Sequence, residues 1–312
     1  MSTATFSGSS SPKNSTTVRP TSSSPPERSR VEQALYTSAW PLRALARVSP
    51  ALAGRAAARA FFTTYRPPVR PAEAALLATA ERVEVPFGKQ RLATWVLGDG
   101  PTVLLTHGWN GRAAQLAPLV GALATAGFRA VVFDHPGHGE SPGSWTTIPE
   151  MVHALSEVDG WLGGAHAVVG HSMGAVLVTL AQARTIRPKR VVFIASPIEP
   201  TSWPKAFARR LGLPPSVDRA MLAAVEARAG TAITTIDPRP LLPTLSAPLL
   251  VVHDRSDREV PFSAGATIAA TCPDAELLAT DGLGHHKVLR DPQVGERVLA
   301  FLAPLTAPHR RT

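Results

Sequence analysis

The strongest constraint on the fold of this chain is a regular alternation, from residue 80 onward, of short β-branched apolar runs with longer Ala-rich stretches. Strands that are apolar along their whole length are buried on both faces, which is typical of parallel sheets covered by helices on each side. We therefore predict an α/β domain with a mostly parallel central sheet and helices on both faces. The first two strands should form a hairpin around Gly88. The expected strands are 82–87, 92–97, 103–106, 130–134, 167–170, 190–195, 248–253 and 275–279, and the expected helices are 112–126, 147–162, 173–186, 262–271 and 290–302.

The rest of the chain divides by composition. A tail rich in Ser, Thr and Pro is too poor in large apolar side chains to offset the entropy of ordering, so we predict that it is disordered. A basic stretch follows whose prolines divide it into short helical pieces, which predicts a helical arm. One Pro-rich segment interrupts the alternation of the main domain, and we interpret it as a cap inserted over the carboxyl ends of the strands, where sites lie in sheets of this kind. The predicted boundaries are 1–30 for the tail, 31–80 for the arm, 81–303 for the domain, about 198–246 for the cap and 304–312 for a C-terminal tail.

The positive charge is concentrated near the N-terminus. The chain carries a formal net charge of +9, of which residues 1–72 supply +8 and the rest only +1. A nearly neutral body disfavours a nucleic-acid enzyme with a basic groove. In the arm, four arginines could share one helical flank: Arg43, Arg47, Arg55 and Arg59. They favour either an arm packed on the body with solvated arginines or a weak contact of residues 31–65 with an anionic membrane surface.

Several other classes are disfavoured. No apolar run reaches the roughly 18 residues needed to cross a bilayer, so we do not expect an integral membrane protein. The single cysteine, Cys272, cannot form a disulfide within the chain, which is compatible with a reducing compartment, and we expect a cytoplasmic location. No glycine-rich dinucleotide motif follows the first buried strand. His135 and His138 beside Asp134 lack the spacing of a binuclear metal hydrolase, so we expect neither a cofactor nor a metal.

The sequence Ala167–Gly174, AVVGHSMG, places Ser172 between a buried strand and an apolar helix. A Gly-x-Ser-x-Gly sequence in this context is typical of a sharp turn that holds a nucleophilic serine above the sheet. A serine hydroxyl needs a base and an orienting acid. His285 and His286 follow the last strand and are candidate bases, whereas Asp254 and Asp257 follow the preceding strand and are candidate acids.

Taken together, these motifs resemble the α/β-hydrolase family over about residues 81–303. The matching sequences are HGW at 107–109, DHPGHGES at 134–141, GHSMG at 170–174, DREVP at 257–261 and GLGHHKVL at 282–289. The resemblance implies Ser172 as nucleophile, Asp257 as acid and His285 as base. It also implies that the backbone N–H groups of Trp109 and Met173 form the oxyanion hole. Asp254 and His286 remain the alternatives for the acid and the base.

The resulting hypothesis is a serine hydrolase that cleaves a small-molecule carboxylic ester through an acyl-enzyme. Thioesters, lactones or a cofactor-free perhydrolase reaction would use the same residues, and a non-catalytic ligand-binding protein with this fold is the alternative from another class. The candidate substrate-binding residues lie beside the nucleophile and in the cap: His107, Gly108, His171, Trp203 and Phe207. The sequence does not indicate an oligomeric state.

Overall fold

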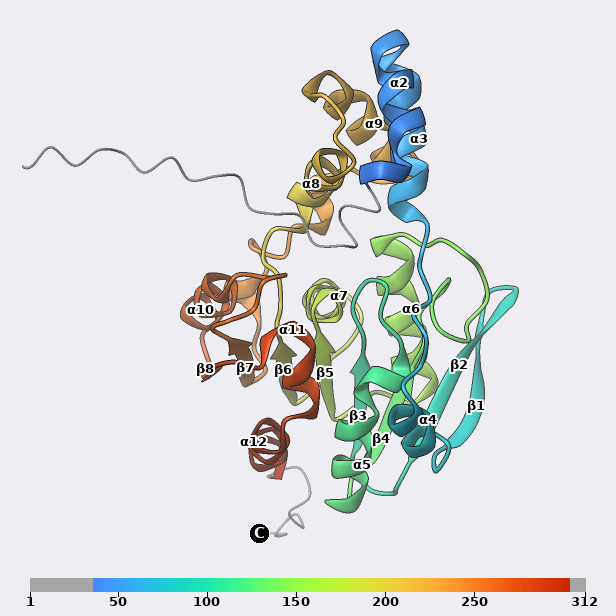
Figure 1. Ribbon diagram of the computed structural model, residues 1–312. Helices are drawn as coiled ribbons and strands as arrows, with labels where there is room; N and C mark the ends of the chain where they lie inside the picture. The colour runs from blue at the N-terminus through green and yellow to red at the C-terminus, as the bar shows by residue number, and fades with distance from the viewer. Residues whose placement is uncertain (1–35, 304–312) are drawn as a thin grey trace, which may run out of the picture.

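The computed structural model describes residues 36–303, built around one eight-stranded sheet (Figure 1). The strand order is β1-β2-β4-β3-β5-β6-β7-β8; β1 and β2 form an antiparallel hairpin, β2 pairs antiparallel with β4, and all other neighbours are parallel. This confirms the predicted fold class. The strands are β1 Glu81–Phe87, β2 Gln90–Leu97, β3 Thr102–Thr106, β4 Arg129–Phe133, β5 Ala167–His171, β6 Arg190–Ile194, β7 Leu249–Asp254 and β8 Ala275–Thr280. The predicted tails, 1–30 and 304–312, lie outside the described residues.

Two apolar cores separate the sheet from its two layers of helices. On one face, α6 (Ile148–Trp161), α7 (Met173–Gln182) and α10 (Phe262–Thr271) pack against the strands. On the other, α4 (Pro71–Leu77), α5 (Ala117–Thr125) and α12 (Pro292–Leu302) do so. The central strands β3, β5 and β7 are buried at every residue, as expected for strands covered on both sides. In such sheets the functional groups gather beyond the carboxyl ends of the strands.

A third apolar core lies beyond that edge, where a cap and an N-terminal arm pack together (Figure 1). The cap contains α8 (Trp203–Arg210) and α9 (Asp218–Ala229), and the arm contains α2 (Trp40–Val48) and α3 (Pro50–Phe62). The backbones of α3 and α9 approach so closely that a Cβ on Gly54 would lie 2.7 Å from the Met221 nitrogen. The arm is therefore part of the cap structure.

The segment after α3 ties the arm to the body. The Thr64 amide donates to the Ser144 carbonyl, and the Arg66 guanidinium donates to the carbonyls of Ser141 and Gly143 at 2.6 and 2.7 Å. These bonds hold the base of the arm against the loop that follows β4. Within residues 36–303, no helix is long and apolar enough to cross a membrane.

The prolines of the arm begin helices. Pro41 lies in the first turn of α2 and Pro50 is the first residue of α3, where the missing N–H costs nothing because it would have no partner in the helix. The four arginines do not all share an exposed flank. Arg43 is half-buried and donates to the Leu211 carbonyl at 3.2 Å, so it joins the arm to the cap, whereas Arg47, Arg55 and Arg59 are exposed.

Candidate active site

Ser172 lies in a strained turn between β5 and α7. Its φ of 54° and ψ of −123° are unusual for a residue with a side chain, and such strain is characteristic of functional sites. Two glycines make the turn fit: a Cβ on Gly170 would lie 2.6 Å from the Ala175 backbone, and one on Gly174 would lie 2.4 Å from the Thr106 carbonyl. The Ser172 amide donates to the Ile194 carbonyl of β6 at 2.8 Å. The backbone at Ser172 is thus held in the sharp strand-to-helix turn that the sequence predicts for a nucleophilic serine.

Asp257 and His285 meet as the sequence predicts. Asp257 follows β7, and His285 lies in α11 (Gly284–Lys287) after β8. Asp257 Oδ2 is 2.8 Å from His285 Nδ1, and both side chains are buried. Asp257 Oδ1 accepts from the backbone N–H groups of Glu259 and Val260 at 2.8 and 2.9 Å. Burial raises the pKa of Asp257, but the hydrogen bonds from His285 and from these amides outweigh it and leave the pKa lowered. The carboxylate is therefore ionised and can orient the imidazole.

The His285 imidazole lies beside the turn that carries Ser172. His171, the residue before the nucleophile, places its Nε2 3.0 Å from the His285 carbonyl oxygen, and the two rings are 4.9 Å apart between centroids. In the described part of the chain, no hydrogen bond joins the Ser172 hydroxyl to His285. Catalytic contacts are often long without substrate and tighten only in the complex. The structure thus brings His171, which precedes the predicted nucleophile, into contact with His285 of the Asp257–His285 pair. The Ser172 hydroxyl is not hydrogen-bonded to His285 in this conformation.

The two alternative residues have other partners. Asp254 accepts from the Ser256 amide and hydroxyl, the Thr280 hydroxyl and the Leu283 amide, at 2.6–3.0 Å. Burial raises its pKa, but these bonds lower it well below the usual range. Asp254 therefore joins the two loops that carry the acid and the base.

The second candidate base is half-exposed. His286 Nε2 lies 2.9 Å from Glu259 Oε1, and the hydrogen bond to this carboxylate raises the pKa of His286. A histidine with a raised pKa and a surface carboxylate partner is a poorer general base at neutral pH. The geometry favours His285.

A second imidazole near Asp257 was not anticipated. His253, in β7, is fully buried, and its Nε2 lies 3.7 Å from Asp257 Oδ2 and 3.1 Å from the Val260 carbonyl. Gly265 of α10 leaves room for this ring, since a Cβ there would lie 2.4 Å from His253 Nδ1. The signal in the sequence was a histidine inside an otherwise apolar strand, directly before Asp254.

The two predicted oxyanion donors lie on segments that touch at the turn. A Cβ on Gly108 would lie 2.9 Å from Ser172 Cβ and 3.3 Å from the Met173 nitrogen. Only a glycine lets the segment after β3 approach the nucleophile this closely. This packing brings the residue before Trp109 directly against the Met173 amide.

The two histidines predicted to bind substrate, His107 and His171, make hydrogen bonds within the protein. His107 is fully buried, with Nδ1 2.7 Å from the Gly108 carbonyl and Nε2 accepting from the His135 amide at 3.1 Å. Burial lowers the pKa of His107 and His135 well below their usual range, lowers that of His138 to about 4 and lowers that of His171 to about 3. These rings are neutral, and both ring nitrogens of His107 are already hydrogen-bonded, so neither is free for a substrate.

Asp134 organises the loop beneath these rings. Its Oδ1 accepts from the Ala113 amide at 2.6 Å and its Oδ2 from the Glu140 amide at 2.7 Å, while burial raises its pKa to about 6. Gly139 packs directly on this carboxylate. Across residues 36–303, no group of three or more His, Cys, Asp or Glu side chains is arranged to hold a metal ion.

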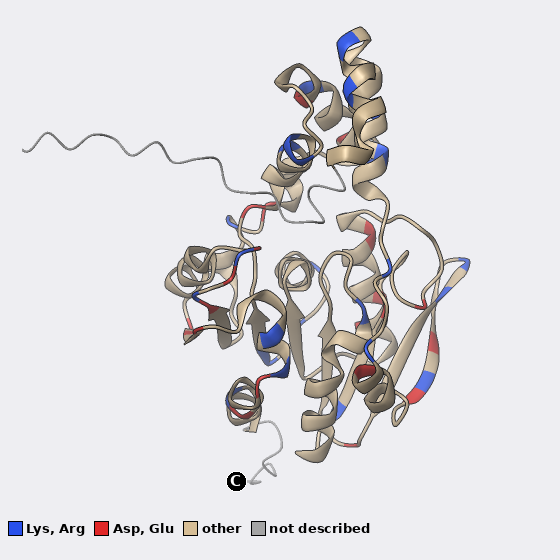
Figure 2. Ribbon diagram, viewed as in Figure 1, with Lys and Arg blue, Asp and Glu red and all other residues tan. Residues whose placement is uncertain are grey.

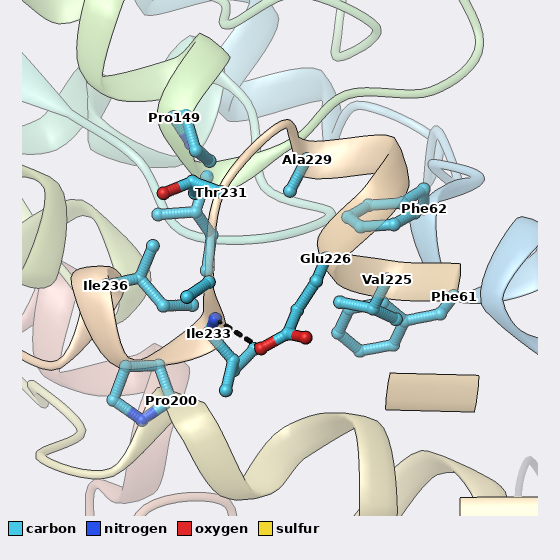
Figure 3. Close-up of a pocket in the computed structure, with 12 residues that line it drawn as sticks. Phe61, Phe62, Pro149, Pro200, Val225, Glu226, Ala229, Thr231, Ile233 and Ile236 are labelled. Atoms are coloured by element: carbon cyan, nitrogen blue, oxygen red, sulfur yellow. Dashed lines mark hydrogen bonds between the residues drawn. The ribbon is translucent and has the colours of Figure 1, made fainter. Parts of the chain in front are cut away.

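A small apolar pocket lies between the arm, the cap and the body (Figure 3). Phe61 and Phe62 of the arm face Val225 of α9 and Ile233, which follows it. The pocket is small, with a volume of about 20 Å³. The residues that line it are Phe61, Phe62, Ile148, Pro149, Pro200, Val225, Glu226, Ala229, Thr231, Ala232, Ile233 and Ile236. Trp203 and Phe207, predicted to bind substrate, are not among them.

Phe61 links this pocket to the predicted oxyanion hole. Its ring is stacked on Trp109, with centroids 6.0 Å apart and planes inclined by 18°, and Phe207 packs edge-on against Phe61 at 5.6 Å. Trp203 packs instead against the core beneath the cap. The sequence analysis did not identify Phe61, because nothing in the sequence of the arm indicates that it packs at the carboxyl edge of the sheet.

A second hollow, of about 440 Å³, lies between residues 66–69 and the loops after β3 and β4, and none of the three predicted catalytic residues lines it. It borders Arg112, which is buried and paired with Glu73 at 3.1 Å. The Arg112 Nε and Nη1 atoms have no partner among the described residues and are sealed from solvent.

Comparisons with known proteins agree with this architecture. Similar sequences include a pimeloyl-[acyl-carrier protein] methyl ester esterase of Xanthomonas campestris, 27% identical over 67% of this chain and 98% of the relative. A putative carbamate hydrolase of Variovorax paradoxus is also 27% identical, over 67% of this chain and 94% of its own.

Solved structures give the same fold. An esterase of Pyrococcus furiosus superimposes with a TM-score of 0.62 at 19% identity, covering 79% of this chain and 98% of its own. A bromoperoxidase of Bacillus anthracis does so with a TM-score of 0.55 at 20% identity, covering 72% and 100%. The family model described as "Alpha/beta hydrolase family" matches residues 103–295, well over half of the chain. The chain therefore belongs to the alpha/beta hydrolase family.

Proposed function

We propose that this protein hydrolyses a small-molecule carboxylic ester through an acyl-enzyme formed on Ser172. The observation that carries the proposal is the buried Asp257–His285 pair, 2.8 Å apart, beside a serine held at φ 54° between two closely packed glycines. A carboxylate, an imidazole and a serine in this relation perform acyl transfer on several unrelated folds. The similarity to a methyl ester esterase supports an ester as the substrate class.

In the proposed reaction, His285 Nε2 accepts the hydroxyl proton as Ser172 Oγ attacks the carbonyl carbon of the ester. The carbonyl oxygen becomes negative and is held by the backbone N–H groups of Trp109 and Met173. His285 then donates the proton to the departing alcohol, which leaves the acyl group on Ser172. Water then attacks the acyl carbon and gives a proton to His285, which passes it to Ser172 Oγ as the bond between Oγ and the acyl carbon breaks, and the carboxylic acid is released. Throughout, Asp257 holds the imidazole tautomer and stabilises its charged form.

The apolar pocket supports a short acyl group. Its volume of about 20 Å³ is close to that of one or two ordered water positions, which is enough for the end of a short chain. The ring of Phe61, which lines the pocket, is stacked on the side chain of Trp109, whose backbone N–H is a proposed oxyanion donor. We infer that this pocket holds the apolar end of the acyl chain and that Phe61 limits its length.

The test is hydrolysis of p-nitrophenyl esters of increasing acyl length by the full chain. Turnover is expected with acetyl and butyryl esters, to decrease with decanoyl esters, and to be lost in Ser172→Ala. Phe61→Ala should improve the decanoyl to acetyl ratio of kcat/KM, with Phe87→Ala, a partly buried ring on β1, as the matched control. A Ser172→Ala variant as active as the parent would overturn the proposed reaction, whereas an unchanged ratio in Phe61→Ala would overturn only the assignment of the pocket.

Hydrolysis of thioesters or lactones and the perhydrolase reaction would need the same residues. The similarity to the putative carbamate hydrolase adds carbamates to these alternative substrates. The same screen, repeated with these substrates, ranks them by kcat/KM. The non-catalytic alternative predicts no turnover of any of them. The cytoplasmic location stays a prediction.

A further inference from the structure

The outer face of the arm combines exposed apolar and cationic side chains. On α2, Trp40 is 66% exposed and Val48 is 86% exposed, and on α3, Leu52 is 52% exposed. Arg47 lies beside Val48, and Arg55 follows Leu52 by three residues, so that the two share a side of α3. Three of the eight large apolar side chains that are exposed among the described residues lie on these two helices, and apolar side chains that gather on one surface mark interaction sites.

The inner face of the same helices has the opposite character. Ala46 of α2 and Ala53, Gly54, Ala57 and Ala58 of α3 are buried, and they pack into the core shared with the cap. These small residues, together with Phe62, fix the arm to the cap, whereas Trp40, Val48 and Leu52 are directed outward. The arm stands at the end of the molecule away from the sheet (Figure 1), where its outer face meets no other described element.

The charge on this face has one sign. The chain has no Asp or Glu between Glu32 and Glu73, and Figure 2 shows blue but no red on α2 and α3. In the described residues, Arg47, Arg55 and Arg59 form no ion pair. The residues before the arm also carry more Lys and Arg than Asp and Glu, and a second copy of the arm would have the same charge. Neither complements this face.

We propose that this face, made of Trp40, Arg47, Val48, Leu52, Arg55 and Arg59, binds the surface of an anionic lipid bilayer. The apolar side chains enter the boundary between headgroups and acyl chains, where tryptophan is favoured, and the guanidinium groups pair with lipid phosphates. The helices lie on the membrane and do not cross it. The cap and its pocket are thereby held close to the lipid surface, because α3 contributes both Leu52 to the binding face and Phe61 to the pocket.

The experiment is co-sedimentation of the full chain with phosphatidylcholine vesicles, with and without phosphatidylglycerol. Binding is expected only with phosphatidylglycerol and should weaken as salt is added, because exposed charges are screened. Each arginine near an anionic surface favours binding by roughly fivefold, so the triple variant Arg47→Gln, Arg55→Gln, Arg59→Gln should bind about 100-fold more weakly. Trp40→Ala should weaken binding without changing its salt dependence.

The matched control changes the same amount of charge elsewhere. Lys89→Gln, Arg184→Gln and Lys189→Gln replace three exposed cations of the body, one in the turn between β1 and β2 and two between α7 and β6. This variant should bind as the parent does, and circular dichroism of each variant checks that the fold is kept. If the parent does not bind the anionic vesicles, or if both triple variants lose binding equally, the proposal is overturned; a protein partner for this face would give the first of these results.

Discussion

Replacing Asp257 by Asn distinguishes an orienting carboxylate from a merely structural one. Asp257 Oδ1 accepts two backbone N–H groups, at 2.8 and 2.9 Å, and an Asn side-chain oxygen can keep both. The other position then becomes an NH₂ group facing His285 Nδ1, where Oδ2 now lies at 2.8 Å. The imidazole can restore this hydrogen bond only by moving its proton to Nε2, since both atoms would otherwise be donors.

The consequence is a large loss of activity with little loss of stability. A proton on Nε2 prevents that nitrogen from accepting the Ser172 proton, and the same change in a serine protease lowers kcat by about 10⁴-fold, equivalent to about 5.4 kcal/mol. Because no buried group is left without a partner, the free energy of unfolding should decrease by only about 1 kcal/mol. The assay is kcat for p-nitrophenyl acetate together with urea unfolding.

Asp254→Asn is the matched control. Asp254 accepts hydrogen bonds from the Thr280 hydroxyl and the Leu283 amide, so its replacement should loosen the two loops. We expect a clear decrease in the free energy of unfolding and only a small decrease in kcat. If Asp257→Asn retains kcat within about tenfold of the parent while Asp254→Asn loses it, the reasoning is refuted and Asp254 is the orienting acid.

Two further predictions concern packing and acid stability. Gly108→Ala places a methyl group 2.9 Å from Ser172 Cβ, and the displacement of this segment should lower kcat/KM by about 100-fold. The control is Gly160→Ala, where the new methyl group has no atom within 4 Å, and it should leave kcat/KM unchanged. Equal activity of the two variants would contradict the role of Gly108. His138 and His171 have lowered pKa values of about 4 and 3, so the unfolded chain binds more protons and stability is lost as pH falls below about 6.5. At pH 5 these two histidines cost about 4 kcal/mol of stability relative to pH 8, and the pKa of Asp134, raised to about 6, offsets about 1 kcal/mol because its protonation favours the folded state. The lowered pKa values of His107 and His135 add to the loss. Urea unfolding should therefore show a free energy of unfolding lower by about 3 kcal/mol or more at pH 5 than at pH 8, and equal stability would contradict the assigned burial.

The alternation of apolar runs was sufficient to predict the sheet. The strand over 167–170 and the helix over 262–271 were placed to within a residue, because a run of Val and Ala between glycines, or an Ala-rich stretch after a proline, has few other ways to be buried. The topology of parallel sheets then brings the loops after β7 and β8 to one edge. The meeting of the loops that carry the candidate acids and bases was therefore predictable from the pattern, whereas the choice of Asp257 and His285 within those loops came from the resemblance to the α/β-hydrolase family.

The packing of the arm on the cap was not predictable. The sequence around Gly54 and its neighbouring alanines predicts only an ordinary helix. Their small side chains are required because α9, more than 160 residues later in the chain, packs closely against them. The same holds for Arg43, whose bond to the Leu211 carbonyl removes it from the exposed flank. Contacts between segments so far apart leave no periodic signal, and for this reason the sequence did not point to Phe61 as a pocket residue.

The most direct test of the proposed chemistry is peptide mapping of the adduct formed with a fluorophosphonate, which reacts preferentially with activated serines. The parent should carry one phosphonyl group, on Ser172, and His285→Ala should slow its formation by orders of magnitude while His286→Ala does not. An adduct on another residue, or labelling of Ser172 at the same rate without His285, would contradict the proposal that His285 activates Ser172.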